Sequence, residues 1–176
     1  MSQTDEVRLV LRAQSGDVSA FEALIVAIEP PLRGYLLRLL GGRAGADDIL
    51  QEALLRMWRG LGWLRDPALF RAWSYRIATR EAHRAMRRES KHETLRADAG
   101  ALDALAAPFT DHETRLDAER RLSQVSPRAR LVLVAHYFEG LSLEEISAAT
   151  EAPLGTVKSR LASGLAQIRA LMSAGR

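Results

Sequence analysis

Residues 142–172 constrain the fold more than any other part of this chain. Ser142 and Glu145 have the spacing of a capping box, which predicts that a helix begins there. Pro153 ends this short helix, because proline disfavours helical backbone in the residue before it. A second helix follows, with an apolar stripe made of Val157, Leu161, Leu165, Ile168 and Met172. Two helices joined by a tight turn have the layout of a helix-turn-helix, which reads DNA with its second helix.

The other face of this second helix is small, polar and basic, as a helix that enters the major groove requires. It carries Thr156, Lys158, Ser159, Ala162 and Ser163. An ordinary amphipathic hairpin with a solvated polar face would have the same spacing. From these residues alone, both interpretations stay open.

The rest of the chain also predicts helices and no strands, so we expect an all-α fold. Helices are expected over 5–14, from Asp17 or Ser19 to residue 40, over 46–61, over 69–88, and after Ser126-Pro127. Pro30-Pro31 is expected to kink or divide the second of these. Trp58 and Phe138 are expected in the core. We predict two small helical domains, residues 1–91 and 116–176, joined by a flexible linker over 92–115.

Charge is distributed in blocks that follow this division. Residues 64–91 carry eight basic and three acidic side chains, a net charge of +5. Residues 92–118 have a net charge of −4, and residues 152–176 contain four basic side chains and no acidic one. Two basic blocks separated by an acidic one favour two polyanion-binding modules on a tether, although solvated helix faces also carry charge runs.

The sequence offers no enzyme site and predicts no cofactor. The absence of cysteine excludes disulfides, thiolate metal sites and a cysteine nucleophile. The four histidines lack metal-ligand spacing, and the glycine-rich segment 41–45 lacks the lysine and hydroxyl residue of a phosphate-binding loop. The polar N-terminus does not have the form of a signal peptide, and the apolar run 23–28 is too short for membrane insertion. We therefore expect a soluble, cytoplasmic protein.

Two blocks together resemble the extracytoplasmic-function (ECF, group 4) sigma factors of bacterial RNA polymerase. The first covers residues 16–88 and includes the segments ADDILQEALLRMWR (46–59) and FRAWSYRIA (70–78). The second covers residues 126–171, with PLGTVKSRL (153–161) as its signature. The order and separation of the two blocks make the resemblance more specific than either block alone.

The resemblance implies a role and site residues for each domain. Region 2, the first domain, would bind the clamp helices of the largest subunit of core RNA polymerase through Asp47, Asp48, Gln51, Glu52 and Arg56. It would also hold the melted −10 promoter element, through the loop at 63–69 and through Trp73, Arg76, Arg80, Arg84, Arg87 and Arg88. Region 4 would read the −35 element with Thr156, Lys158, Ser159, Arg160, Ala162 and Ser163. An anti-sigma factor would be a further partner and would cover the DNA-binding faces.

The chain departs from the family pattern at positions that bear on DNA binding. The fourth helix of the family often reads Arg-Asn-x-x-x-Asp, where this chain has Thr79, Arg80 and Arg84. The recognition helix commonly carries a bulky residue and an arginine, where this chain has Ala162 and Ser163. Two alternatives therefore remain beside a promoter-specificity factor. One is a conventional dimeric helix-turn-helix regulator on a palindrome, and the other is a sigma-like protein that sequesters partners without initiating transcription.

Overall fold

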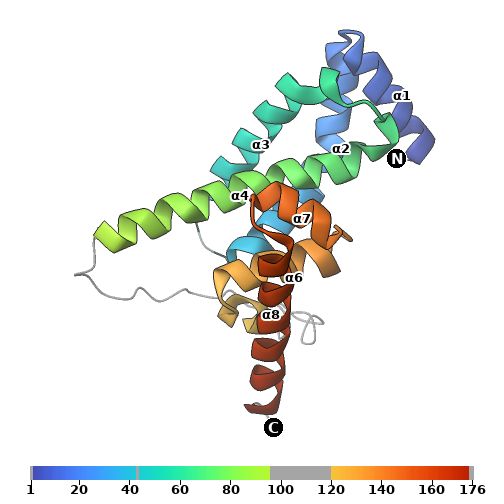
Figure 1. Ribbon diagram of the computed structural model, residues 1–176. Coiled ribbons are helices and arrows are strands. Elements are labelled where there is room, and N and C mark those ends of the chain that lie inside the picture. Colours follow the sequence, from blue (N-terminus) through green and yellow to red (C-terminus); the bar gives the residue numbers. More distant parts are fainter. Residues whose placement is uncertain (1, 43, 96–119, 175–176) are drawn as a thin grey trace, which may run out of the picture.

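The computed structural model describes residues 2–42, 44–95 and 120–174, and all regular structure within these ranges is helical (Figure 1). The first domain contains α1 (Gln3–Gln14), α2 (Val18–Leu40), α3 (Ala46–Gly60) and α4 (Phe70–Leu95), with short 3-10 turns η1 (Leu61–Trp63) and η2 (Pro67–Leu69) before α4. The second contains α6 (Pro127–Tyr137), α7 (Leu143–Thr150) and α8 (Leu154–Ala174). The all-α prediction is confirmed. The predicted linker lies mostly outside the described residues.

Local capping interactions fix the start of several helices. Ser2 and Asp5 form a capping box at α1, and the Asp17 carboxylate accepts a hydrogen bond from the Ala20 N–H at the start of α2. The predicted capping box of Ser142 and Glu145 is confirmed at α7. These interactions involve residues three positions apart, which is why the sequence locates these helix starts well.

Pro30 and Pro31 do not divide the second helix, because both lie inside the continuous α2. The N–H groups that proline lacks leave carbonyl oxygens of the preceding turn without helical partners. Both prolines are exposed, and so is Val26 in the turn before them. Water can therefore solvate that turn, which lets the helix continue.

The predicted helix start at Ser126-Pro127 is confirmed, although the Ser126 hydroxyl accepts a hydrogen bond from the Gln167 amide and does not cap α6. Three expectations about single side chains are wrong. Trp58 and Phe138 are about half-exposed instead of buried, and Met172 is exposed while Leu171 packs against the core instead. Each of these side chains lies at a helix end or at the edge of an apolar stripe, where the sequence pattern discriminates poorly.

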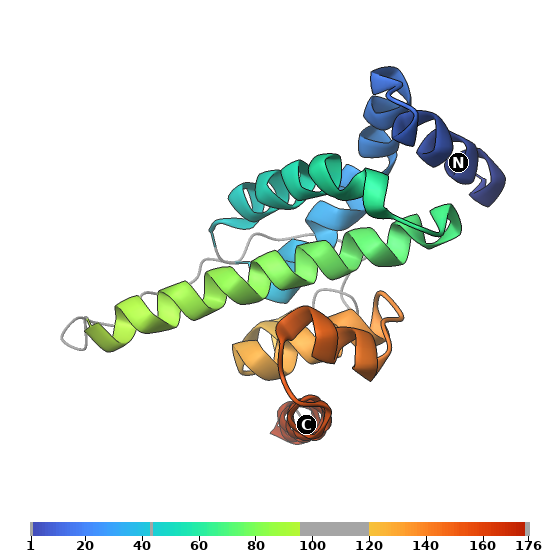
Figure 2. The same ribbon diagram turned by 45° about the horizontal axis from the view of Figure 1, so that its top comes forward.

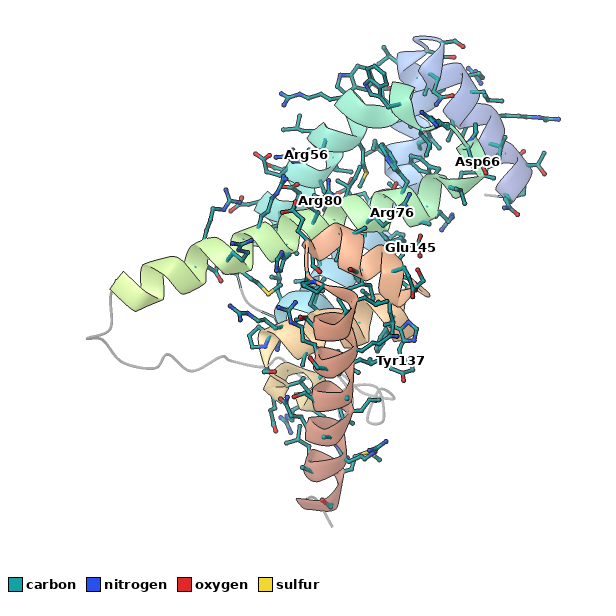
Figure 3. All side chains as sticks on the ribbon, in the orientation of Figure 1. Arg56, Asp66, Arg76, Arg80, Tyr137 and Glu145 are labelled. Carbon is teal, nitrogen blue, oxygen red and sulfur yellow. The ribbon has the colours of Figure 1, made fainter. Side chains whose placement is uncertain are left out.

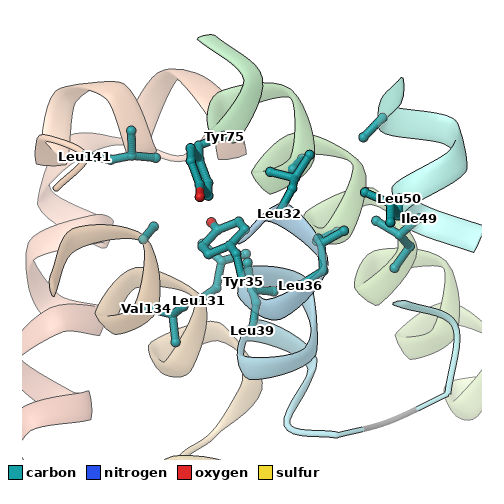
Figure 4. Packing of buried hydrophobic residues seen from close by; sticks show 14 of the residues in the cluster. Leu32, Tyr35, Leu36, Leu39, Ile49, Leu50, Tyr75, Leu131, Val134 and Leu141 are labelled. Atoms are coloured by element: carbon teal, nitrogen blue, oxygen red, sulfur yellow. The ribbon is translucent and has the colours of Figure 1, made fainter. Parts of the chain in front are cut away.

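The two domains pack against one another on α2 and α4. In Figure 2, α3 lies on one side of α4, and α6 and α7 lie on the other. Buried side chains of both domains form one continuous cluster, in which Leu131 and Val134 of α6 face Tyr35 and Leu39 of α2 (Figure 4). The two domains therefore share an apolar interface, which the sequence did not predict.

Two further features concern the described residues alone. None of their helices combines the length and the apolar character that crossing a lipid bilayer requires. None of their histidine, aspartate and glutamate side chains gathers in a group of three that could bind a metal ion.

Candidate nucleic-acid and polymerase surfaces

The turn of the helix-turn-helix presents one face of α8 to solvent. Glu151 ends α7 with a left-handed backbone (φ 54°), and the Pro153 carbonyl accepts hydrogen bonds from the amides of Thr156 and Val157. Val157 is fully buried and anchors the start of α8. The side chains exposed on the outer face are Lys158, Ser159, Ala162 and Ser163. Four of the six residues predicted to contact the −35 element therefore share an open surface.

Thr156 and Arg160 are half-buried and lie at the edge of this surface. Burial, and then the nearby positive charge of Arg128, lower the pKa of Arg160. Burial also lowers the pKa of His83 on α4, assisted by the charges of Arg160, Arg87 and Arg128. The start of the recognition helix and the second half of α4 thus contribute to one concentration of positive charge.

The predicted −10 residues of α4 divide into two groups. Arg76 Nη1 lies 3.6 Å from Glu145 Oε1 on α7, and Arg80 Nη2 donates a 3.3 Å hydrogen bond to the Ala148 carbonyl at the end of α7 (Figure 3). Arg87 and Arg88 are exposed. The helix that would hold phosphates therefore presents part of its positive face to solvent and part to the second domain.

Arg84 and Trp73 make structural contacts within the first domain. Arg84 Nη1 lies 3.0 Å from Glu81 Oε1. Trp73 packs beside Phe70, with ring centroids 6.1 Å apart. A Cβ at Gly60 would lie 3.3 Å from the Trp73 ring, so glycine allows the indole to approach α3. Trp73 thus helps to fix the α3–α4 connection.

That connection, residues 61–69, holds an aromatic side chain in solvent. The Gln14 side-chain amide donates hydrogen bonds of 2.9 and 2.8 Å to the carbonyls of Leu61 and Leu64, and Asp66 accepts one from the Ala68 amide. Trp63 nevertheless remains 86% exposed. The same loop carries the exposed Arg65. An exposed indole and a nearby cation on an anchored loop are typical of sites that bind single-stranded bases.

The predicted polymerase-binding residues follow one side of α3. Asp47 and Asp48 lie in its first turn, where the helix dipole favours acidic groups, and Asp47 Oδ1 is 3.1 Å from Arg33 Nη1. Asp48, Gln51 and Glu52 are exposed. Arg56 differs from these residues, because its Nε lies 2.7 Å from Oε1 of the buried Glu81.

Leu55 and Trp58 extend this acidic side and were missed as candidate site residues. They are 48% and 50% exposed. Leu55 lies four positions after Gln51 and Trp58 seven positions after it, so all three share one side of the helix. The Trp58 ring contacts the edge of Phe21, with centroids 4.7 Å apart, so one part of the indole is anchored. Exposed apolar side chains beside a polar row are typical of a protein-binding surface.

Two family models match this chain, one in each domain. The family model for Sigma-70 region 2 matches residues 24–92, and that for Sigma-70, region 4 matches residues 115–168. The RNA polymerase sigma-H factor of Pseudomonas aeruginosa is 30% identical over 174 residues, covering 92% of this chain and 90% of the relative. The ECF RNA polymerase sigma-E factor of Escherichia coli K12 is 29% identical over 171 residues, covering 90% and 88%.

Solved structures share the fold. The sigma factor RpoE of Bartonella quintana, solved with the anti-sigma factor NepR, has a TM-score of 0.69 and 21% identity, over 89% of this chain and 98% of its own. CnrH, solved with the cytosolic domain of CnrY, has a TM-score of 0.62 and 21% identity, over 98% and 99%. With both sigma regions matched in order and relatives aligned over most of their length, this chain belongs to the sigma-70 family, as an RNA polymerase sigma factor of the ECF type.

Proposed function

We propose that the two domains of this ECF sigma factor contact separate parts of a promoter complex in the cytoplasm. Residues 1–91 bind core RNA polymerase and the −10 element, residues 116–176 bind the −35 element, and residues 92–115 connect them. Sigma factors are not enzymes, since the polymerase carries out the chemistry and the sigma factor supplies promoter recognition. The observation that carries the proposal is the open, basic face of α8, joined in one chain to a region 2 that exposes both an acidic-apolar stripe and a tryptophan loop.

The −35 element is read from the outer face of α8. Lys158 provides a positive charge for a phosphate or a base edge, and Ser159 and Ser163 provide hydroxyl groups. Thr156 and Arg160 contact the groove edge, and Ala162 permits close approach. Because Ala162 and Ser163 have short side chains, contacts to the groove depend mainly on Lys158 and Arg160.

The −10 element is held by α4 and the loop before it. Arg87 and Arg88 contact phosphates of the separated strand, and Trp63 stacks on an unpaired base. Arg76, Arg80 and Arg84 add positive charge along the same helix, while Trp73 supports the loop from within. Two of these arginines contact α7, so full use of the surface requires the two domains to separate.

Polymerase binding uses the exposed side of α3. Asp47, Asp48, Gln51 and Glu52 supply polar contacts, and Leu55 and Trp58 supply apolar area to the clamp helices of the largest subunit. Arg56 orders this side of the helix through Glu81 and reaches the polymerase only with its exposed part.

An anti-sigma factor is the second protein partner in this proposal. Its support is the shared fold with the sigma factor RpoE, solved with the anti-sigma factor NepR, and with CnrH, solved with the cytosolic domain of CnrY. The closed arrangement of the two domains offers such a partner a surface that spans both.

The test is addition of the chain to core polymerase, followed by transcription from DNA of its source genome. Formation of a stable complex and promoter-dependent transcripts support the proposal. Stable binding without transcripts would favour the sequestering alternative. Dimeric binding to palindromic DNA without polymerase would favour a conventional regulator.

A further inference from the structure

The C-terminal end of α2 receives an arginine from the second domain. Arg130 of α6 is only 3% exposed. Its Nε donates a 2.9 Å hydrogen bond to the Leu39 carbonyl, and its Nη2 donates a 3.1 Å hydrogen bond to the Leu40 carbonyl. Its Nη1 donates to the Ser123 carbonyl within its own domain at 2.7 Å. The guanidinium therefore joins the two domains through main-chain oxygens.

Helix α2 is suited to this contact in two ways. In its last turn, the carbonyls of Leu37 and Arg38 accept hydrogen bonds from the amides of Gly42 and Gly41. The Leu39 and Leu40 carbonyls, at the negative end of the helix dipole, remain available to a cation. Gly41 then ends the helix with a left-handed backbone (φ 67°), and a Cβ at this position would lie 2.6 Å from Arg130 Cζ. The guanidinium therefore occupies space that only glycine leaves open.

Other contacts between the domains surround this one. Arg38 Nη2 lies 3.3 Å from Glu139 Oε1, and the Arg38 guanidinium carbon lies 5.2 Å from the centre of the Phe138 ring. Buried apolar side chains complete the interface, among them Leu131, Val134 and Leu141 of the second domain (Figure 4). An apolar interface with a buried, hydrogen-bonded charge has a defined geometry.

The same interface brings α7 onto α4. Arg76 faces Glu145, and Arg80 donates to the Ala148 carbonyl at 3.3 Å (Figure 3). These arginines belong to the proposed −10 surface. The first helix of the helix-turn-helix thus covers the middle of α4 as long as the domains are closed.

We propose that insertion of Arg130 into the Gly41 end of α2 is an intramolecular lock that holds the free chain closed and masks Arg76 and Arg80 from single-stranded DNA. The chain closes without a partner protein, since every contact above lies within it. The masking part of the proposal rests on the proposed −10 role of α4, whereas the lock does not.

The test of the lock measures the distance between the domains in the full chain. Because the chain has no cysteine, A23C on α2 and A170C on α8, both at exposed positions, allow two spin labels to be attached specifically. The otherwise unchanged chain should give one narrow distance distribution. Arg130→Met, which keeps the length of the side chain but removes its donors, should broaden it toward longer distances. Arg128→Met, an exposed arginine on the same helix, is the matched control and should leave it narrow.

A glycine pair provides a second, independent test. Gly41→Ala should open the chain, because its Cβ collides with Arg130. Gly42→Ala is the control, since Gly42 has a similar left-handed backbone (φ 76°) but nothing within 4 Å of an added Cβ. Circular dichroism verifies that all variants remain helical. A broad distribution in the unchanged chain, or equal distributions for Gly41→Ala and Gly42→Ala, would overturn the lock.

The test of masking measures the affinity of the full chain for a labelled single-stranded oligonucleotide. If about one molecule in ten is open at equilibrium, Arg130→Met should raise this affinity about tenfold. Adding Arg76→Ala and Arg80→Ala to Arg130→Met should abolish the gain. If Arg130→Met opened the domains but did not change the affinity for the oligonucleotide, the lock would be supported and the masking would be overturned. Failure of the sigma function itself would appear only in transcription with polymerase, so the outcomes are distinguishable.

Discussion

Arg56 on α3 and Glu81 on α4 form an ion pair, with Nε 2.7 Å from Oε1, and Arg84 binds the same carboxylate oxygen at 3.0 Å. Glu81 is almost completely buried, whereas both arginines are partly exposed. We predict that Glu81→Ala lowers the free energy of unfolding by about 1–3 kcal/mol, because two partly exposed guanidinium groups lose their shared charged acceptor. Urea denaturation measures this, with exposed Glu22→Ala as a control. If Glu81→Ala were as stable as the unchanged chain, the ion pairs of Glu81 with Arg56 and Arg84 would not stabilise the fold.

Trp58 should contribute to polymerase binding more than to stability. Trp58→Ala is predicted to weaken binding to core polymerase by about 2 kcal/mol, as expected for a tryptophan at an interface centre. The loss in folding stability should be smaller, since half of the side chain is already exposed. Competition for labelled core polymerase measures the affinity. An unchanged affinity would remove Trp58 from the interface.

Trp63 should contribute to binding of the melted −10 strand instead of to polymerase binding. Its side chain is 86% exposed, so Trp63→Ala is expected to leave the unfolding midpoint within experimental error. Loss of one stacked base should weaken binding of the melted −10 strand by about 1–3 kcal/mol. Promoter opening, followed by permanganate reactivity of unpaired thymines, reports on this step. If Trp63→Ala opened promoters normally but bound core polymerase weakly, Trp63 would belong to the polymerase surface and not to the −10 surface.

Lys158 is predicted to contact the −35 element. If it contacts a phosphate, Lys158→Ala should weaken binding about equally across sequences and reduce the salt dependence by about one counterion. If it contacts a guanine edge, preference at one base pair should fall by about 1–3 kcal/mol. Holoenzyme binding to promoter variants over a range of salt concentrations separates these cases. If Lys158→Ala produced neither of these changes, Lys158 would lie outside the interface.

Glu139 should make the stability of the closed chain depend on pH. Burial raises the pKa of Glu139 above its usual value of 4.5, and the hydrogen bond from Tyr75 and the charge of Arg38 offset this only in part. The folded state therefore binds more protons than the unfolded state between 4.5 and the raised pKa, so stability falls as pH rises through this window.

Glu139→Gln removes this titration and keeps a hydrogen-bond acceptor near Arg38 and Tyr75. The difference in unfolding free energy, wild type minus variant, should therefore decrease from pH 4.5 upward and then level off. Urea titrations of both proteins over the same pH series measure the difference. A difference that increased with pH would mean that the Arg38 pair dominates over burial.

The sequence predicted the features that depend on neighbouring residues. The α7 capping box, the end of α7 before Pro153 and the inward-facing Val157 all follow from spacings of a few residues, and all are present. Glu139 illustrates the opposite case, since its partners Arg38 and Tyr75 lie about 100 and 60 positions away in the chain. No local pattern predicts such contacts.

Arg130 shows most clearly why the packing of the domains was missed. In the sequence it is one of several arginines near the start of a helix, where solvent exposure is the usual outcome. It is buried because the unpaired carbonyls and the glycine at the end of α2 accept it, ninety positions earlier in the chain. The glycine pair at 41–42 was identified as a helix end, but nothing in the sequence shows which side chain would occupy it.

Promoter-directed initiation by this chain is measured by transcription with core RNA polymerase on fragmented source-genome DNA, with and without the chain, and by mapping of the RNA 5′ ends. We expect new start sites that share a pair of upstream elements at −35 and −10 spacing, and we expect Lys158→Ala to reduce initiation at them. Stable association with polymerase without new starts, or new starts with no shared upstream element, would contradict this expectation.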